Sequence, residues 1–374
     1  MITLSPATLP APPVPAGKIY FRGLNGLRAV AALAVVFSHI HMSLFWFNLP
    51  NLPTLALAEF GVTMFFALSG FLITYLLLAE RTRTGQVDVK KFYARRILRI
   101  WPLYFLYLAV AVAVAWWLAG VAPNANLWYY LLFVPNVPSV LGVSLPYLAH
   151  YWSLGVEEQF YSFWPWTVKK FKNPIVFFVA FVLLFLLAKA VVSFGWGGYS
   201  DEYTLLYMTR FSCMAIGAVG AWLLYYNQQW ALGLLVNRLA EAAAWAVVGL
   251  VVINRFHVFS IIDHEIIAGV TVVLILNQGG GRPLISLENR LLDFLGSISF
   301  GVYVYHPVLI FLLSLLLRDV LPGAYYPKLA LIYAAVVGGT IGIAYLSLTY
   351  LEKPFLAFKE KFTVVQSANR RRAA

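Results

Sequence analysis

The stretch RAVAALAVVFSH, residues 28–39, places an arginine and a histidine at the two ends of a segment in which nine of the ten intervening residues are apolar. An arginine at bilayer depth costs about 2.5–3.5 kcal/mol even on lenient insertion scales, so a residue kept there usually has a function. Eleven helical residues make three turns plus about 20°, which puts Arg28 and His39 on one face, about 16 Å apart along the axis. We expect that face to point into a helix bundle.

The composition places the rest of the chain in the membrane as well. It is 61% hydrophobic and 11% charged, whereas an ordinary soluble domain is about 25% charged. Apolar runs of about 20 residues, long enough to cross a bilayer as helices, recur along the chain. They predict an all-α fold, a polytopic integral membrane bundle of about ten transmembrane helices. The predicted spans lie near residues 24–46, 60–80, 101–119, 151–168, 174–194, 204–226, 239–254, 263–278, 294–316 and 328–351.

Three segments follow from this pattern. Residues 1–20 are predicted to be a disordered, proline-rich cytoplasmic tail, residues 21–355 the membrane domain, and residues 356–374 a basic cytoplasmic tail. The first apolar run carries Arg28 and lacks a small-residue cleavage site. We therefore interpret it as a retained span and not as a signal peptide.

The formal charge of +12 reflects orientation in the membrane. With the N-terminus inside, the predicted spans put 22 of the 27 basic residues on the cytoplasmic side and three outside. This asymmetry predicts that both termini are cytoplasmic. Basic residues at that surface contact lipid headgroups, so we expect membrane lipids and no nucleic acid as partners. The single cysteine, Cys213, excludes a disulfide framework and a cysteine-rich metal site, and no metal ion is expected.

A cluster of arginines begins the third span, in the stretch KKFYARRILRIWP, residues 90–102. Arg95, Arg96 and Arg99 lie three and four residues apart, so their guanidinium groups converge at the cytoplasmic edge. Such a group suits phosphate oxygens, which guanidinium binds bidentately. The alternative is a polybasic belt on anionic lipid.

Two adjacent carboxylates occur in YWSLGVEEQFY, residues 151–161. On a helix Glu157 and Glu158 point about 100° apart and cannot both face one partner. Within a span each carboxyl needs a cationic or hydrogen-bonding partner, or must be protonated. The alternative to a functional role is a structural ion pair with Arg28 or Arg210.

A polar stripe follows in LGSISFGVYVYHP, residues 295–307. Ser299, Tyr303 and His306 recur at spacings of four and three, so they share one helix face. For Ser299 and Tyr303 we favour a role in joining helices through hydrogen bonds. For His306 both a structural and a catalytic role stay open.

Together the motifs resemble a known family. Six motifs occur in a fixed order along the chain. They are the arginine and histidine of the first span, GFL at residues 70–72, the two arginines of the pattern Arg96-x-x-Arg99, WSLGVEEQFY, SFGVYVYHP, and LEKP at residues 351–354. The chain in this respect resembles acyltransferase family 3, membrane O-acyltransferases that acetylate bacterial surface polysaccharides and some secondary metabolites. The resemblance covers about residues 20–355.

The resemblance implies ten helices, an acyl-coenzyme A donor and transfer to a sugar hydroxyl. It also implies that Arg28 and His39 belong to the catalytic site and that one of Glu157 and Glu158 is essential. Some relatives carry an additional extracytoplasmic domain like a serine esterase. This sequence contains none, so we expect the membrane domain or separate polysaccharide-assembly proteins to handle the acceptor.

We therefore predict an acyltransferase of the bacterial inner membrane that moves an acyl group, expected to be acetyl, from cytoplasmic acetyl-CoA to an exported carbohydrate, with a lipid-linked glycan among the candidate acceptors. Arg95, Arg96 and Arg99 would bind the donor phosphates. His39 would act as general base or accept the acyl group itself, and Arg28 or a backbone donor would stabilise the oxyanion. The alternatives are a proton-coupled secondary transporter of an anionic solute and a non-enzymatic scaffold.

Overall fold

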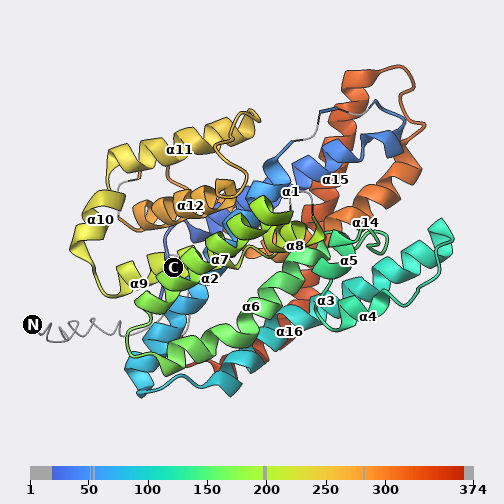
Figure 1. Cartoon of the computed structure of the whole chain (residues 1–374). Coiled ribbons are helices and arrows are strands. Elements are labelled where there is room, and N and C mark those ends of the chain that lie inside the picture. The colour runs from blue at the N-terminus through green and yellow to red at the C-terminus, as the bar shows by residue number, and fades with distance from the viewer. Residues whose placement is uncertain (1–18, 51, 54, 197–199, 281–282, 366–374) are drawn as a thin grey trace, which may run out of the picture.

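The computed structural model describes residues 19–50, 52–53, 55–196, 200–280 and 283–365. Within these residues every regular element is a helix and no strand forms, as predicted (Figure 1). Almost all of the predicted N-terminal tail, and residues 366–374 of the predicted C-terminal tail, lie outside the described residues.

Each of the longer helices overlaps a range that the apolar runs predict, although the third begins at Val89, well before the predicted start at residue 101. They are α1 (Leu24–Met42), α2 (Leu57–Thr84), α3 (Val89–Ala119), α6 (Tyr151–Lys170), α7 (Ile175–Trp196), α9 (Phe211–Tyr225), α11 (Arg238–Val252), α12 (Asp263–Gly279), α14 (Ser299–Leu317) and α15 (Tyr325–Leu346). Shorter helices join them: η1 (Leu44–Phe47), α4 (Leu127–Leu131), α5 (Asn136–Val140), α8 (Asp201–Thr209), α10 (Gln229–Leu235), α13 (Arg290–Ser297), η2 (Ser347–Glu352), α16 (Lys353–Lys359) and η3 (Glu360–Phe362).

The predicted count of ten spans is not confirmed. Among the described residues seven helices are long and apolar enough to cross a membrane, or eight if α10 and α11, bent by 53°, are one span. The predicted spans that do not qualify are occupied by α6 and α12, and the span of α11 qualifies only if it is joined to α10. The 17 residues of α12 are short for a span, and α6 carries the polar run Glu157–Gln159.

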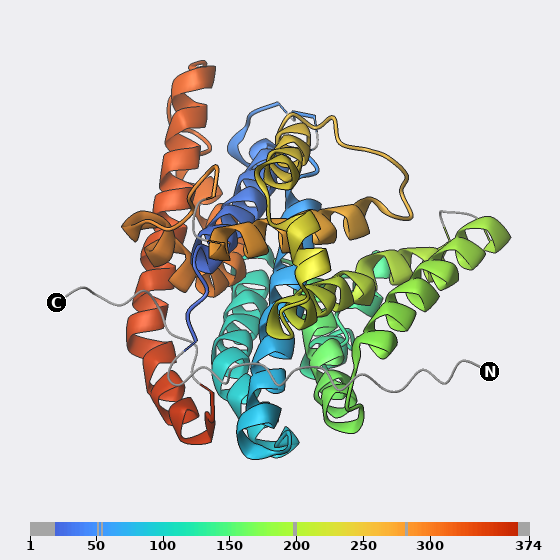
Figure 2. The same ribbon diagram turned by 90° about the vertical axis from the view of Figure 1, so that its left-hand side faces the viewer.

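Helix α2 lies at the centre of the bundle. Its most apolar window is 78% buried, whereas that of α7 is 11% buried, so α7 presents most of its surface to the surroundings. Figure 2 shows α15 and α16 on one side of the molecule and α7 on the other, with α2 between them. Where α2 meets α9, a Cβ atom at Gly70 would overlap the backbone carbonyl of Met214. Glycine at position 70 therefore permits the close contact between these helices.

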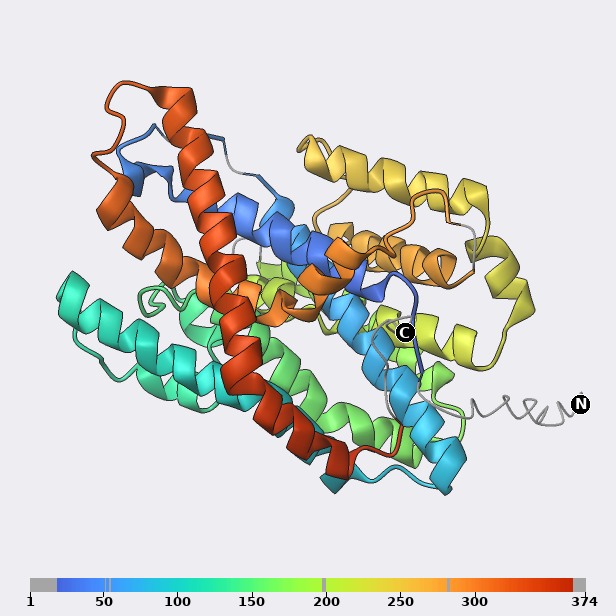
Figure 3. The same cartoon turned by 180° about the vertical axis from the view of Figure 1, so that it is seen from behind.

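One helical run crosses the whole bundle at its edge. Helix α15 continues through the π-helical segment η2 into α16, and Pro354 lies in the first turn of α16, where a helix tolerates proline (Figure 3). Helical structure extends to Phe362, beyond the predicted start of the C-terminal tail at residue 356. This extension brings Lys359 against the start of α3, where the arginine cluster lies.

Candidate active site

A cavity in the centre of the bundle collects side chains from five helices. It holds about 790 Å³ of space, including the part that opens to solvent. Of the predicted site residues it is lined by Arg28 from α1, Arg96 and Arg99 from α3, Glu157 from α6, and Ser299 and Tyr303 from α14. Residues that lie far apart in the sequence therefore share one cavity, because α1, α2, α3, α6 and α14 all border it.

A second cavity lies beside the first, at the end of the bundle where α2 ends and α3 begins. It holds about 770 Å³ on the same measure and shares Arg96 and Arg99 with the first cavity. Arg95 and Lys359 also line it. A ligand entering through the second cavity would pass these cations before it reached the first.

The three arginines of the cluster differ in how their charge is matched. Arg95 forms an ion pair of 2.7 Å with Glu80 and donates to the carbonyl oxygen of Phe362 at 2.8 Å. Arg96 stacks on Phe92 and Tyr161, with its guanidinium carbon 5.5 and 5.6 Å from the ring centroids, and its buried Nε has no hydrogen-bond partner among the described residues.

Neither Arg96 nor Arg99 forms an ion pair with a described carboxylate. Because Arg95 is already neutralised by Glu80, Arg96 and Arg99 are the members of the cluster with charge available for an anionic ligand.

The two adjacent glutamates face different surroundings, as the helical geometry predicts. Glu157 lines the first cavity, within electrostatic range of Arg28 and Arg96. Glu158 turns toward α3 and accepts a hydrogen bond of 3.2 Å from the indole Nε1 of Trp101, while its other oxygen is buried without a partner among the described residues. Of the two carboxyls, only that of Glu157 contacts the cavity.

His39 is paired with His306. Nδ1 of His39 lies 2.6 Å from Nε2 of His306, and the two rings stack with their centroids 4.9 Å apart. A third imidazole, that of His150 just before α6, has its ring centroid 5.4 Å from that of His306. His39 is half-buried, whereas His150 and His306 are buried. The three histidines form one cluster, which we call the histidine cluster.

Tyr303 separates the histidine cluster from the first cavity. Its ring lines the cavity beside Phe65, and its hydroxyl donates to the carbonyl oxygen of His150 at 2.9 Å and contacts the Ser153 hydroxyl at 2.5 Å. We expected Arg28 and His39 to face a common passage. Arg28 lines the cavity but His39 does not, and the Tyr303 ring lies between them in the sense that it lines the cavity and also contacts the rings of His150 and His306.

The polar stripe on α14 has mixed roles. Tyr303 joins α14 to α6 through its hydroxyl, as we favoured. Ser299 donates to the carbonyl oxygen of Gly296 in α13, three residues earlier in the chain, so its hydrogen bond joins α14 to the short helix directly before it.

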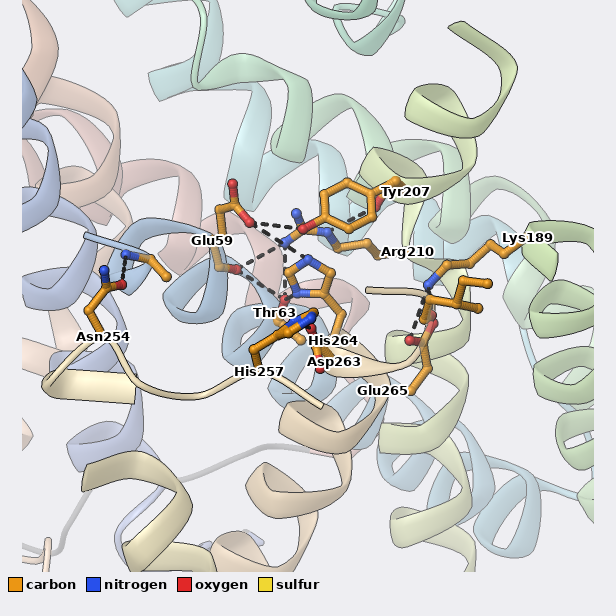
Figure 4. A network of polar contacts seen from close by, with 12 residues as sticks. Glu59, Thr63, Lys189, Tyr207, Arg210, Asn254, His257, Asp263, His264 and Glu265 are labelled. Atoms are coloured by element: carbon orange, nitrogen blue, oxygen red, sulfur yellow. Dashed lines mark hydrogen bonds and ion pairs between the residues drawn. The ribbon is translucent and has the colours of Figure 1, made fainter. Parts of the chain in front are cut away.

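Arg210 lies in a separate polar network, which Figure 4 shows. It occupies the break between α8 and α9, with a φ of 45°, and donates to the backbone carbonyl of Glu59 at 2.9 Å and the hydroxyl of Thr63 at 3.1 Å. Its guanidinium stacks on Trp152. It forms no ion pair with Glu157 or Glu158, so the alternative in which Arg210 neutralises one of them is wrong.

Sequence reasoning missed two residues of this region. The predicted C-terminal tail includes Lys359, although helix α16, which starts at Lys353, carries it to the second cavity. His150 was not considered, although it directly precedes the motif YWSLGVEEQFY. Its place directly before that motif is the signal that the sequence offers, whereas its contacts with Tyr303 and His306 are known only from the structure.

Comparisons with known proteins find relatives with O-acetyltransferase names. A Staphylococcus aureus (strain COL) protein with a provisional O-acetyltransferase name is 27% identical over 90% of this chain and 57% of its own length. The peptidoglycan O-acetyltransferase OatA of Listeria monocytogenes is 25% identical over 91% of this chain and 58% of its own. The O-acetyltransferase OatA of Staphylococcus aureus (strain NCTC 8325) is 31% identical over 39% of this chain and 24% of its own. This chain thus spans little more than half the length of the first two relatives.

No solved structure matches the chain. The acyltransferase domain that defines acyltransferase family 3 matches residues 21–349, a range that includes Arg28, the arginine cluster, both glutamates and the histidine cluster. The resemblance inferred from the ordered motifs is therefore confirmed. The chain belongs to acyltransferase family 3.

Proposed function

We propose that this protein is an integral membrane O-acyltransferase that transfers an acetyl group from cytoplasmic acetyl-CoA to a hydroxyl of an exported carbohydrate. The observation that carries the proposal is the pair of adjacent cavities that share Arg96 and Arg99, neither of which forms an ion pair with a described carboxylate. Family membership supports acyl transfer, and the name of the Listeria relative supports a glycan acceptor.

The donor would bind with its phosphates in the second cavity. Arg96, Arg99 and Lys359 line it, and a polyanion gains most from cations that lack other partners. The thin pantetheine arm would then extend through the first cavity, past Arg28 and toward Tyr303. This direction requires the second cavity to face the cytosol, which agrees with the orientation predicted from the basic residues.

The transfer itself would use His39 as general base. The acceptor hydroxyl gives its proton to Nε2 of His39, its oxygen attacks the thioester carbon, the C–S bond breaks, and the departing CoA sulfur takes up the proton. Arg28 would stabilise the oxyanion. Because Tyr303 closes the cavity, the thioester reaches His39 only when the Tyr303 side chain leaves its hydrogen bonds with His150 and Ser153.

A reconstituted assay tests the donor site. Purified protein in lipid nanodiscs is given acetyl-CoA and a glycan acceptor, and free CoA thiol and the O-acetyl ester are measured together. We expect the double substitution Arg96→Ala and Arg99→Ala to raise the KM for acetyl-CoA by at least about 10-fold, since each charge-assisted hydrogen bond contributes about 1.5–3 kcal/mol. The exposed Lys90, which does not line either cavity, provides the control Lys90→Ala. An unchanged KM in the double variant would exclude this donor site.

The same assay separates the enzyme from its alternatives. Release of CoA thiol matched by ester formation supports the acyltransferase. Proton-coupled uptake of a solute without thiol release would support the transporter. If neither activity is observed, the non-enzymatic scaffold is supported. A labelled acetyl group trapped on His39 in the absence of acceptor would show that His39 acts as the nucleophile and not as the general base.

A further inference from the structure

Solvent reaches His39 from a side other than the two donor cavities. Its side chain is only partly buried, yet it lines neither cavity. Nε2 of His39 forms no hydrogen bond with a described residue and is not among the side-chain atoms that are buried without a partner. We therefore expect an acceptor hydroxyl that gives its proton to this nitrogen to approach through another opening.

The three chain segments that lead from the histidine cluster toward the predicted extracytoplasmic end each carry an aromatic ring. They are Trp46 in η1, shortly after α1, Tyr147 in the loop before α6, and Phe311 on α14, beyond His306. The ring centroid of Phe311 lies 4.6 Å from that of Tyr147 and 5.9 Å from that of Trp46. The centroids of Trp46 and Tyr147 are 6.3 Å apart. We call these three residues the aromatic platform.

The aromatic platform has two polar atoms available for a ligand. Its three side chains are all partly buried. Nε1 of Trp46 and the hydroxyl of Tyr147 form no hydrogen bond with a described residue, and neither atom is among those buried without a partner, so solvent reaches both. A sugar ring has C–H groups on its face and hydroxyls at its edge. It therefore complements apolar ring faces that lie beside available N–H and O–H groups.

Tyr147 is held in a backbone conformation that a bulky residue rarely adopts. Its φ is 59°, in the left-handed region. Its carbonyl oxygen accepts a hydrogen bond of 3.0 Å from the hydroxyl of Tyr107 on α3, which itself accepts from the N–H of Val308 on α14 at 3.3 Å. The loop is thus fixed to two helices, although glycine or asparagine would suit its backbone better. A conformation kept at a cost in stability is typical of functional sites.

A role as membrane anchors explains the aromatic platform less well. Tryptophan and tyrosine gather at membrane interfaces, where their rings lie at the level of the lipid headgroups. Trp128 on α4 is 65% exposed and has the exposure expected of such an anchor. The rings of the aromatic platform instead contact one another and are partly buried.

We propose that the aromatic platform is the acceptor subsite, on which a pyranose ring stacks and presents a hydroxyl to Nε2 of His39. The donor then approaches from the second cavity and the acceptor from the opposite end of the bundle. The inference rests on the proposed function for the reaction that follows, whereas binding of a sugar ring depends on the aromatic platform alone.

Binding of an oligosaccharide tests the aromatic platform without turnover. The probe is chitotetraose, a chain of N-acetylglucosamine rings, and the measurement is a saturation-transfer NMR titration with purified protein in nanodiscs. We expect saturation of the C–H protons of the sugar rings by the wild-type protein. In Trp46→Ala the Kd should rise by about 10-fold, as is common when an aromatic anchor is truncated. Trp128→Ala is the matched control and should keep the wild-type Kd.

Kinetics connect the aromatic platform to acyl transfer. With chitotetraose as acceptor, Trp46→Ala and Tyr147→Asn should each raise the KM for the acceptor by about 10-fold. The KM for acetyl-CoA should stay within about twofold, because neither residue lines a donor cavity. Asparagine adopts a positive φ more readily than tyrosine, so Tyr147→Asn removes the ring and keeps the backbone. Trp46→Phe retains a ring face and should lose less affinity than Trp46→Ala.

The outcomes for the subsite and for the reaction are distinct. Absence of saturation in the wild-type protein, or equal Kd values in Trp46→Ala and Trp128→Ala, would overturn the acceptor subsite. An unchanged acceptor KM in both Trp46→Ala and Tyr147→Asn would overturn it as well. Binding that is weakened in Trp46→Ala, but with no acetyl transfer by the wild-type protein, would support the sugar site and contradict the proposed function.

Discussion

His39 of α1 and His306 of α14 are in direct contact although 267 residues separate them in the chain. Nδ1 of one lies 2.6 Å from Nε2 of the other, and the rings stack at an interplanar angle of 19°. The contact holds the ring of His39 in one orientation and leaves its Nε2 as the nitrogen available for chemistry. A catalytic base oriented by a second polar group is a recurring arrangement in acyl-transfer enzymes.

Removing the partner of His39 is expected to impair the chemical step. His306→Leu should lower kcat by about 10- to 100-fold, because His39 loses the acceptor that keeps its Nδ1 protonated. His306→Gln supplies an amide oxygen for the same hydrogen bond and should retain more activity. The measurement is kcat and KM for acetyl-CoA in nanodiscs. A KM effect without a kcat effect would contradict this role.

The charge of Lys359 is expected to contribute to donor binding. Lys359→Gln should raise the KM for acetyl-CoA by about 10-fold, because the second cavity loses a cation and a charge-assisted hydrogen bond contributes about 1.5–3 kcal/mol. Lys361, two residues further on, is exposed, stacks on Phe358 and does not line the cavity. Lys361→Gln is therefore the control, and equal KM values in the two variants would refute the assignment.

The Tyr303 ring is expected to keep water away from the thioester. Tyr303→Ala removes the ring that closes the first cavity, so CoA thiol should be released without matching ester formation. Tyr303→Phe keeps the ring and loses the hydroxyl contacts with His150 and Ser153, each worth about 1 kcal/mol. In the Tyr303→Phe variant the ring should leave its position more easily, and release of CoA thiol should still be matched by ester formation. The ratio of CoA thiol released to ester formed checks both variants. A ratio of one in Tyr303→Ala would contradict the role of the ring in excluding water.

Gly70 is expected to matter for stability and not directly for chemistry. Gly70→Ala forces α2 and α9 apart, because the new Cβ meets the carbonyl oxygen of Met214, and overpacking of this kind costs about 1–3 kcal/mol. Gly269 on α12 has nothing within 4 Å of a Cβ atom, so Gly269→Ala is the matched control. Thermal unfolding in nanodiscs should show a lower Tm for Gly70→Ala alone.

A buried ion pair joins α7 to α12. Nζ of Lys189 lies 3.0 Å from the carboxylate of Glu265 on α12, and it also donates to the carbonyl oxygen of Ile261. Lys189→Met leaves the Glu265 carboxylate without its cation, and the free energy of unfolding should fall by about 3–5 kcal/mol.

Replacing both partners, Lys189→Met with Glu265→Leu, should recover most of that loss, because no unpaired charge is then buried. A double-mutant cycle on thermal unfolding checks this, and simple additivity of the two losses would show that the residues are not coupled.

The sequence alone determined that the chain lies in a membrane, that it is helical, which family it belongs to, and most of the predicted residues that line the first cavity. Apolar runs and the shortage of charge are local properties, and they correctly indicated a helical membrane protein. The spacing of Arg96 and Arg99 on one helix, and the divergence of Glu157 from Glu158, follow from 3.6 residues per turn and are found in the structure. Motif order was enough to identify the family that the comparison confirms.

Only the tertiary structure decided which of these side chains meet. Three features depend on contacts between helices. They are the ion pair of Arg95 with Glu80, the placement of Arg210 away from the glutamates, and the position of Tyr303 between Arg28 and His39. The same is true of Lys359 and His150, whose own segments carry no signal of their partners. Helical periodicity specifies the face on which a residue lies, whereas the rotation and depth of each helix in the bundle result from the packing of all its neighbours at once.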